Sequence, residues 1–124
     1  MITKKLFPIT ITTEINLCKE FYLKFFEFEV IFDSDWYIQL KNASGAELAF
    51  MLPNLENQPK SLHNPYSGSG VVLSFEVEDT EGEFVRLKEL GATFELDLKD
   101  EEWGQKHCML KDPSGMIIDI VQQL

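Results

Sequence analysis

The side chains best suited to chemistry follow several segments in which apolar and other residues alternate. One set of alternate residues is expected to face a packed layer of helices, so the residues between them share the opposite face. That opposite face mixes aromatic, apolar and polar groups, which is the usual composition of a small-molecule site. The ligand-binding residues expected on or beside this face are Tyr37, Gln39, Glu47, Met51, Trp103, His107, Met109 and Asp119.

Three of these residues are ionisable at useful pH. His107 is interpreted either as a ligand contact or general base, or as a histidine that is satisfied in the fold or exposed. Glu47 is either a buried base with a raised pKa or a solvated strand residue. Asp119 lies between Ile118 and Ile120, and an unpaired carboxylate on a buried face is costly, so a functional or hydrogen-bonded role is favoured. Glu47 and His107 are therefore the candidate catalytic residues.

Other conspicuous side chains also have plain structural interpretations. Trp36 and Trp103 are placed at the beginnings of strands, where packing or an interface is favoured over stacking on a planar ligand. His63 is expected at the surface. The acidic run of Asp97, Asp100, Glu101 and Glu102 is expected to be a solvated loop, which would repel anions.

Two similar halves are expected to position these residues. Leu40-Lys41-Asn42-Ala43-Ser44-Gly45 returns as Leu110-Lys111-Asp112-Pro113-Ser114-Gly115, each time between two apolar alternating runs. An amphipathic, helix-like segment precedes each copy, so the chain contains two repeats of about sixty residues. A single domain over 1–124 is predicted, with one module over 1–52, a Pro-containing linker over 53–69 and a second module over 70–124.

Each module is predicted to contain a strand, a helix and three further strands. The first strand carries Ile9 and Ile11 on one face and Thr10 and Thr12 on the other, as in a half-buried strand. The second helix is expected to be capped by Thr80 and closed by Gly91. The predicted strands are 7–13, 28–32, 36–41, 47–52, 71–77, 92–98, 105–111 and 116–122, and the predicted helices are 15–27 and 81–90.

Composition narrows the class of protein. A chain of 124 residues with 44% hydrophobic content can bury one core. Its 21 acidic against 11 basic side chains give a formal charge of −10, which argues against a nucleic-acid partner. No apolar run approaches the ~20 residues of a membrane span, so a soluble, cytoplasmic protein is expected. Cys18 and Cys108 are expected to be reduced and structural.

Several segments together carry a family resemblance. They are Phe21-Tyr22 followed by Phe26-Glu27-Phe28-Glu29-Val30, then Glu102-Trp103-Gly104-Gln105, and finally Asp112-Pro113-Ser114-Gly115-Met116-Ile117-Ile118-Asp119. With the duplicated order of elements, they resemble the vicinal oxygen chelate superfamily, which contains glyoxalase I, extradiol dioxygenases, fosfomycin-resistance enzymes and bleomycin-resistance proteins. The resemblance implies an α+β fold of two tandem βαβββ modules, forming a curled mixed sheet around a cleft.

The resemblance also implies where a metal would be held. In the metal-dependent members, ligands come from the first and last strands of each module, and these positions fall here on Pro8 or Phe7, Ala49, Val72 and Asp119. Only Asp119 can ligate, with Glu47 as a possible displaced substitute. Two carboxylates make a poor transition-metal site. No metal or other cofactor is therefore expected, and Glu47 and Asp119 are the remaining metal candidates.

Two classes of function follow from the resemblance. The favoured class is a metal-free binding module, similar to bleomycin-resistance proteins, that sequesters a small organic molecule; the acidic surface would suit a cationic or amphiphilic ligand. The alternative is a superfamily enzyme, a lyase, isomerase or dioxygenase, using a rebuilt metal site at Glu47 and Asp119 or metal-free acid/base chemistry by Glu47 and His107. A dimeric scaffold without a ligand is a third possibility. The helix pattern and the resemblance together predict a homodimer.

Overall fold

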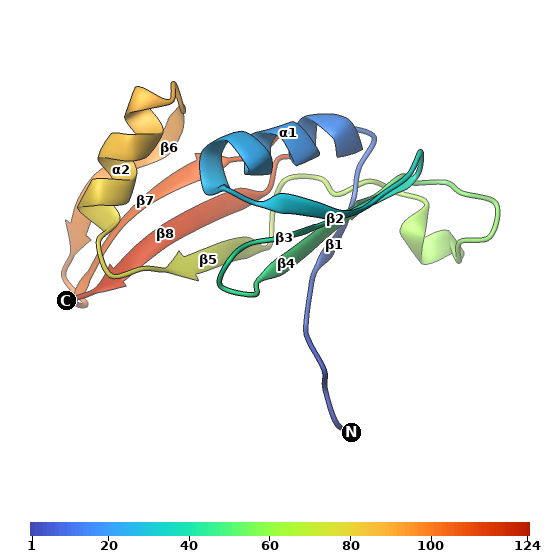
Figure 1. Cartoon of the computed structure of the whole chain (residues 1–124), viewed down its shortest axis with the longest axis horizontal. Helices are drawn as coiled ribbons and strands as arrows, with labels where there is room; N and C mark the ends of the chain where they lie inside the picture. Colours follow the sequence, from blue (N-terminus) through green and yellow to red (C-terminus); the bar gives the residue numbers. More distant parts are fainter. The chain divides into compact units, whose positions relative to one another are not determined.

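A computed structural model describes residues 1–124, which divide into two compact units, Met1–Ser67 and Gly68–Leu124. Each unit contains one open, four-stranded mixed sheet and one α-helix, in the order strand, helix, three strands (Figure 1). The fold is therefore α+β and consists of two tandem βαβββ units, as predicted. Neither helix is long and apolar enough to cross a membrane.

The first unit has the strand order β1-β4-β3-β2. β1 runs parallel to β4, and the other neighbours are antiparallel, since short turns connect β2, β3 and β4. Helix α1 packs against β3 and β4. The elements are β1 (Ile9–Ile11), α1 (Ile15–Phe26), β2 (Glu29–Asp33), β3 (Tyr37–Lys41), β4 (Glu47–Met51) and a 3-10 helix, η1 (Lys60–Leu62).

Helix α1 forms because its apolar residues recur at helical spacing. Ile15, Cys18 and Tyr22 are buried along one stripe, and the Tyr22 ring stacks on Phe50 of β4 with the ring centroids 5.5 Å apart. The helix ends at Glu27, which adopts the left-handed conformation with a φ of 57° and donates its backbone N–H to the Tyr22 carbonyl. This helix covers one face of the sheet and leaves the polar side chains of β3 and β4 on the other.

The second unit repeats this arrangement with the strand order β5-β8-β7-β6. β5 runs parallel to β8, and β6, β7 and β8 pair antiparallel. Helix α2 packs against the three antiparallel strands, above Cys108, Leu110, Ile118 and Ile120, which are buried. The elements are β5 (Val72–Glu76), α2 (Thr80–Glu89), β6 (Phe94–Glu101), β7 (Gln105–Lys111) and β8 (Ile117–Gln123).

The repeated turn motif has the same local cause in both units. Asn42 Oδ1 accepts hydrogen bonds from the backbone N–H groups of Ser44 and Ala46, at 3.1 and 2.9 Å. Asp112 Oδ1 accepts from those of Ser114 and Met116, at 2.8 and 3.1 Å. An Asx side chain that closes a turn in this way replaces hydrogen bonds that the backbone lacks there. The motif therefore fixes the register of both hairpins.

Two local expectations were wrong. The cap of α2 is Asp79, whose carboxylate accepts from the Gly82 N–H, and Thr80 is the first helical residue. The alternation predicted for the first strand holds, with Thr10 on β1 and Thr12 just after it as the buried residues. The acidic run is not a loop throughout: β6 continues to Glu101 and thereby includes most of it. The predicted linker also has order, since Tyr66 donates its N–H to the Ile11 carbonyl within the first unit.

Candidate ligand site

His107 occupies the centre of a polar group in the second unit. Its neighbours on β7, Cys108 and Leu110, alternate toward the apolar core beside α2, so His107 and Met109 face the other way. His107 is nevertheless only 5% exposed. Its Nδ1 lies 2.8 Å from Asp119 Oδ1, and its Nε2 lies 2.9 Å from Glu101 Oε2. The ring is therefore held on both sides by carboxylates.

This geometry favours the protonated form of the imidazole. A neutral imidazole has one N–H and could donate to only one of the two carboxylates, whereas the cation donates to both. Burial disfavours the cation, but the hydrogen bonds to Glu101 and Asp119 outweigh it and raise the pKa of His107 above its ordinary value. The hydrogen bond from His107, assisted by Lys99, lowers the pKa of Glu101. The two hydrogen bonds therefore favour an imidazolium held between two carboxylates.

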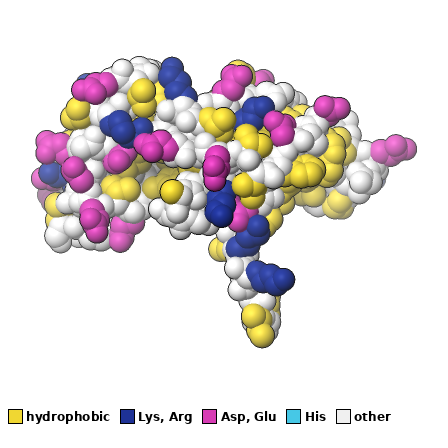
Figure 2. Space-filling model, in the orientation of Figure 1, with side chains coloured by type: hydrophobic (Ala, Val, Ile, Leu, Met, Phe, Trp, Pro, Cys, Tyr) yellow, Lys and Arg dark blue, Asp and Glu magenta, His cyan; other side chains and the backbone are white.

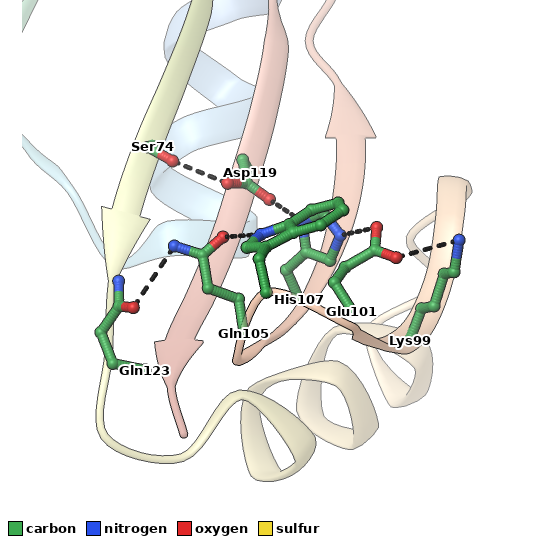
Figure 3. Close-up of polar contacts among 8 residues, drawn as sticks. Ser74, Lys99, Glu101, Gln105, His107, Asp119 and Gln123 are labelled. Atoms are coloured by element: carbon green, nitrogen blue, oxygen red, sulfur yellow. Dashed lines mark hydrogen bonds and ion pairs between the residues drawn. The ribbon is translucent and has the colours of Figure 1, made fainter.

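The hydrogen bonds continue beyond the histidine at both ends. Ser74 Oγ on β5 donates to Asp119 Oδ2 at 2.7 Å, and Lys99 Nζ lies 3.0 Å from Glu101 Oε1 (Figure 3). Ser74 reaches Asp119 because the two residues are register partners on parallel strands. The side chains of four strands thus form one continuous chain of polar contacts from β5 to β6.

An exposed tryptophan borders this chain. Trp103 is 67% exposed, yet its Nε1–H donates to Gln105 Oε1 at 2.8 Å. Gln105 donates in turn to Gln123 Oε1, and Gln123 donates to Glu76 Oε1 at 2.9 Å. The Trp103 ring meets the His107 ring edge-on, with the centroids 6.5 Å apart. The indole is therefore both accessible and fixed in orientation.

The first unit carries a different polar group on the corresponding strands. Tyr37 donates its hydroxyl to Gln39 Oε1 at 2.7 Å, and Gln39 donates to Glu47 Oε1 at 2.6 Å. Lys5 lies 2.9 Å from the same Glu47 oxygen. Hydrogen bonds from Lys5 and Gln39 lower the pKa of Glu47, whereas desolvation raises the pKa of Tyr37. The interpretation of Glu47 as a base with a raised pKa is therefore wrong.

The eight expected ligand-binding residues fall into two groups, one in each unit. Met51 is the register partner of Tyr37, and Met109 is the register partner of Asp119, so both methionines share the faces of the polar groups. The structure brings together Tyr37, Gln39, Glu47 and Met51 in the first unit and Trp103, His107, Met109 and Asp119 in the second. Glu47 and Asp119, paired as metal candidates, lie in different units.

Sequence reasoning did not find Ser74, Lys99 or the role of Glu101. Glu101 was assigned to a solvated loop, although its side chain contacts both His107 and Lys99. A local signal was present for Ser74 alone, because its hydroxyl interrupts the apolar residues Val72, Leu73 and Phe75 of β5.

The residues do not fit a family-type metal centre. The register pairs Ala49 with Ile9, Asp119 with Ser74, and Val72 with Ile117. Asp119 is therefore the single carboxylate at the positions where metal-dependent family members carry their ligands. That carboxylate already accepts hydrogen bonds from Ser74 and His107. No group of three or more His, Cys, Asp or Glu side chains is arranged to hold a metal ion. We derive no chemical step through a metal.

Comparison with known families identifies the chain. A family model described as a glyoxalase-like domain matches residues 6–124, nearly the whole sequence. The chain belongs to the glyoxalase-like domain family. It is thereby a member of the vicinal oxygen chelate superfamily, as the sequence motifs indicated. No curated protein matches the chain.

Solved structures with this glyoxalase-like fold come from several bacteria. A glyoxalase/bleomycin resistance protein/dioxygenase from Nocardioides has a TM-score of 0.82 and 17% identity, over 100% of this chain and 87% of the other. A glyoxalase/bleomycin resistance protein/dioxygenase family enzyme from Burkholderia phytofirmans PsJN has 0.78 and 21%, over 95% and 97%. TnmS3, an antibiotic binding protein from Streptomyces sp. CB03234, has 0.72 and 22%, over 99% and 98%. These likenesses show the fold.

Proposed function

We propose that this glyoxalase-like protein binds a small, amphiphilic organic molecule without using a metal, and that it acts as a sequestering protein in the cytoplasm. The observation that carries the proposal is the exposed Trp103, which a hydrogen bond to Gln105 orients, beside the hydrogen-bonded side chains of His107, Glu101 and Asp119. An accessible aromatic face next to a few fixed polar groups is what a small-molecule site requires. The fold shared with an antibiotic binding protein, TnmS3, supports this reading.

The arrangement of His107 supports binding over catalysis. A histidine that acts as a general base must place a free ring nitrogen within hydrogen-bond reach of the substrate proton. Both nitrogens of His107 already contact carboxylates of the protein, at 2.8 and 2.9 Å. Glu47, the other candidate catalytic residue, has a lowered pKa and so is a weaker base than an ordinary glutamate. No observation favours the lyase, isomerase or dioxygenase alternative.

Calorimetry combined with product analysis tests this proposal. The purified protein, treated with EDTA, is titrated with metal-free bleomycin and with a panel of neutral and cationic aromatic compounds. We expect saturable heat for at least one probe, an unchanged mass of that probe after overnight incubation, and weaker binding by Trp103→Ala. Chemical conversion of a bound probe would instead support the enzyme class, and a protein that binds none of them would contradict the proposal.

We also propose that the protein is a homodimer, as the resemblance implies. Sedimentation velocity at micromolar concentration should give about twice the chain mass of 14.3 kDa. A single species at the mass of one chain would contradict the dimer, and it would leave the binding proposal to be judged by the titrations.

A further inference from the structure

The turn between β6 and β7 brings an aromatic ring and a carboxylate together. The Gly104 N–H donates to the Glu101 carbonyl at 3.1 Å, and Gly104 has a φ of 90°, a conformation that favours glycine. This tight turn holds Glu101 and Trp103 two residues apart at one end of the sheet. Both side chains also contact His107: the Glu101 carboxylate contacts its Nε2, and the Trp103 ring lies against the imidazole ring. The turn is therefore a compact site with an acidic and an aromatic part.

We propose that Trp103 and Glu101 recognise an organic ammonium group borne on an aromatic ligand, and that the Lys99 ammonium occupies Glu101 in the absence of that ligand. This inference rests on the proposed small-molecule binding and names the ligand class of the same site. A cation over an indole face is attracted by the ring quadrupole, and tryptophan gives the strongest such contact of the aromatic side chains. The carboxylate supplies a charge-assisted hydrogen bond to the same group.

The two carboxylate oxygens of Glu101 differ in how readily they can accept a hydrogen bond from a ligand. Oε2 is bonded to the buried ring of His107, which fixes the carboxylate. Oε1 contacts only a lysine whose side chain is 56% exposed, at 3.0 Å (Figure 3). The lysine end of this ion pair is well solvated, so the contact holds Lys99 in place only weakly. A ligand ammonium that also contacts Trp103 gains more than Lys99 does, so it should displace the lysine.

The charge of the second unit favours a cationic ligand over an anionic one. Residues 68–124 contain 13 Asp and Glu against 5 Lys and Arg, a formal charge of −8, whereas residues 1–67 contain 8 against 6. Acidic side chains are spread over the face of the second unit that Figure 2 shows. Such a field raises the local concentration of cations and their association rate, and it is screened by salt.

The first unit provides a matched control. Trp36 is 45% exposed and also precedes a strand, but the ring beside it is Tyr37, at 5.5 Å between centroids. In the first unit the carboxylate of Glu47 contacts Lys5 and Gln39. Trp36→Ala therefore removes an exposed indole of similar type that is not one of the residues of the proposed site.

A pair of probes that differ in one group tests the inference. The intact protein is titrated by calorimetry with 1-naphthylmethylamine, which is a cation at pH 7, and with the neutral 1-naphthalenemethanol. We expect the cation to bind about tenfold or more tightly, since it gains both the indole contact and the carboxylate. Trp103→Ala and Glu101→Gln should remove this preference, and Trp36→Ala should retain it.

The Lys99→Ala variant gives the sharpest outcome. Because Lys99 competes for Glu101, its removal should tighten binding of the amine by about two- to fivefold and leave the alcohol unchanged. Weaker binding of the amine by Lys99→Ala, or equal binding of both probes by the unaltered protein, would overturn the inference while leaving small-molecule binding intact. If the protein binds neither probe and no other compound of the panel, both proposals are overturned. Unchanged binding of the alcohol by Glu101→Gln shows that this variant is folded.

Discussion

His107 Nδ1 and Asp119 Oδ1 lie 2.8 Å apart on neighbouring antiparallel strands, two residues off the direct register, in which His107 pairs with Val121 and Asp119 with Met109. The two residues are brought together by the repeated turn at Asp112, which fixes how β7 and β8 align. This contact orients the ring so that its other nitrogen reaches Glu101. The hairpin thereby positions the polar chain that borders Trp103.

Replacement of His107 should destabilise the protein without abolishing the fold. His107→Ala leaves Asp119 Oδ1 and Glu101 Oε2 without their donor, and an unpaired group near the core typically costs about 2 kcal/mol of the free energy of unfolding. Urea denaturation monitored by circular dichroism measures this loss. His107→Gln, which keeps one donor, should lose less; an Ala variant as stable as the unaltered protein would show that the contacts contribute nothing.

Stability should depend on pH through the His107 and Glu101 pair. The pKa of His107 is raised above its ordinary 6.5, so its contribution is complete below that value and is lost as pH rises through the folded pKa. The pKa of Glu101 is lowered from its ordinary 4.5, so its contribution is present above that value and is lost as pH falls through the folded pKa. The pair therefore stabilises the folded protein most between pH 4.5 and pH 6.5.

Thermal melts from pH 4 to pH 9, about the range in which both groups titrate, provide the measurement. The decline on the alkaline side of the optimum should be smaller in His107→Gln than in the unaltered protein. Proton NMR of the imidazole should report a pKa for His107 above its ordinary 6.5. If the His107 resonance titrates below 6.5, the assignment of an imidazolium is wrong.

Asp79 should stabilise α2 by capping it. Its carboxylate accepts the Gly82 N–H at 3.0 Å, one of the donors that the first helical turn leaves unpaired. Asp79→Ala should lower the free energy of unfolding by about 1 kcal/mol, and Asp79→Ser should restore most of it. Glu78→Ala, at an exposed neighbouring position, serves as the control. Equal effects of Asp79→Ala and Glu78→Ala would argue against the cap.

Cys108 should be unreactive in the folded protein. Burial raises the pKa of its thiol to about 12, so almost no thiolate forms at neutral pH. Cys18 is also fully buried. Incubation with iodoacetamide followed by mass spectrometry should therefore label neither cysteine under native conditions and both in urea. Rapid native labelling of Cys108 would mean that β7 opens, or that the residue is not packed beside α2.

The fold class and the repeated order of elements could be predicted from the amino-acid sequence. Helix α1 and strand β7 follow from residue spacing alone, because the apolar residues of each recur with the period of a helix or strand. The turns at Asn42 and Asp112 follow from side chains that bond to their own backbone. Such interactions act over a few residues, so they can be recognised without a structure. The inward or outward facing of Tyr37, Gln39, His107 and Asp119 follows from the same alternation.

The contacts of His107 could not be predicted from the sequence. The register between β6 and β7 shifts twice, between Phe94 and Leu96 and between Leu96 and Lys99, so alternation counted along β6 loses its phase before Glu101. Ser74 reaches Asp119 across 45 residues of sequence, through a parallel pairing that no local pattern sets. Bulges and long-range pairing are settled by packing of the whole unit, because the free energy that selects them comes from contacts between elements distant in the chain.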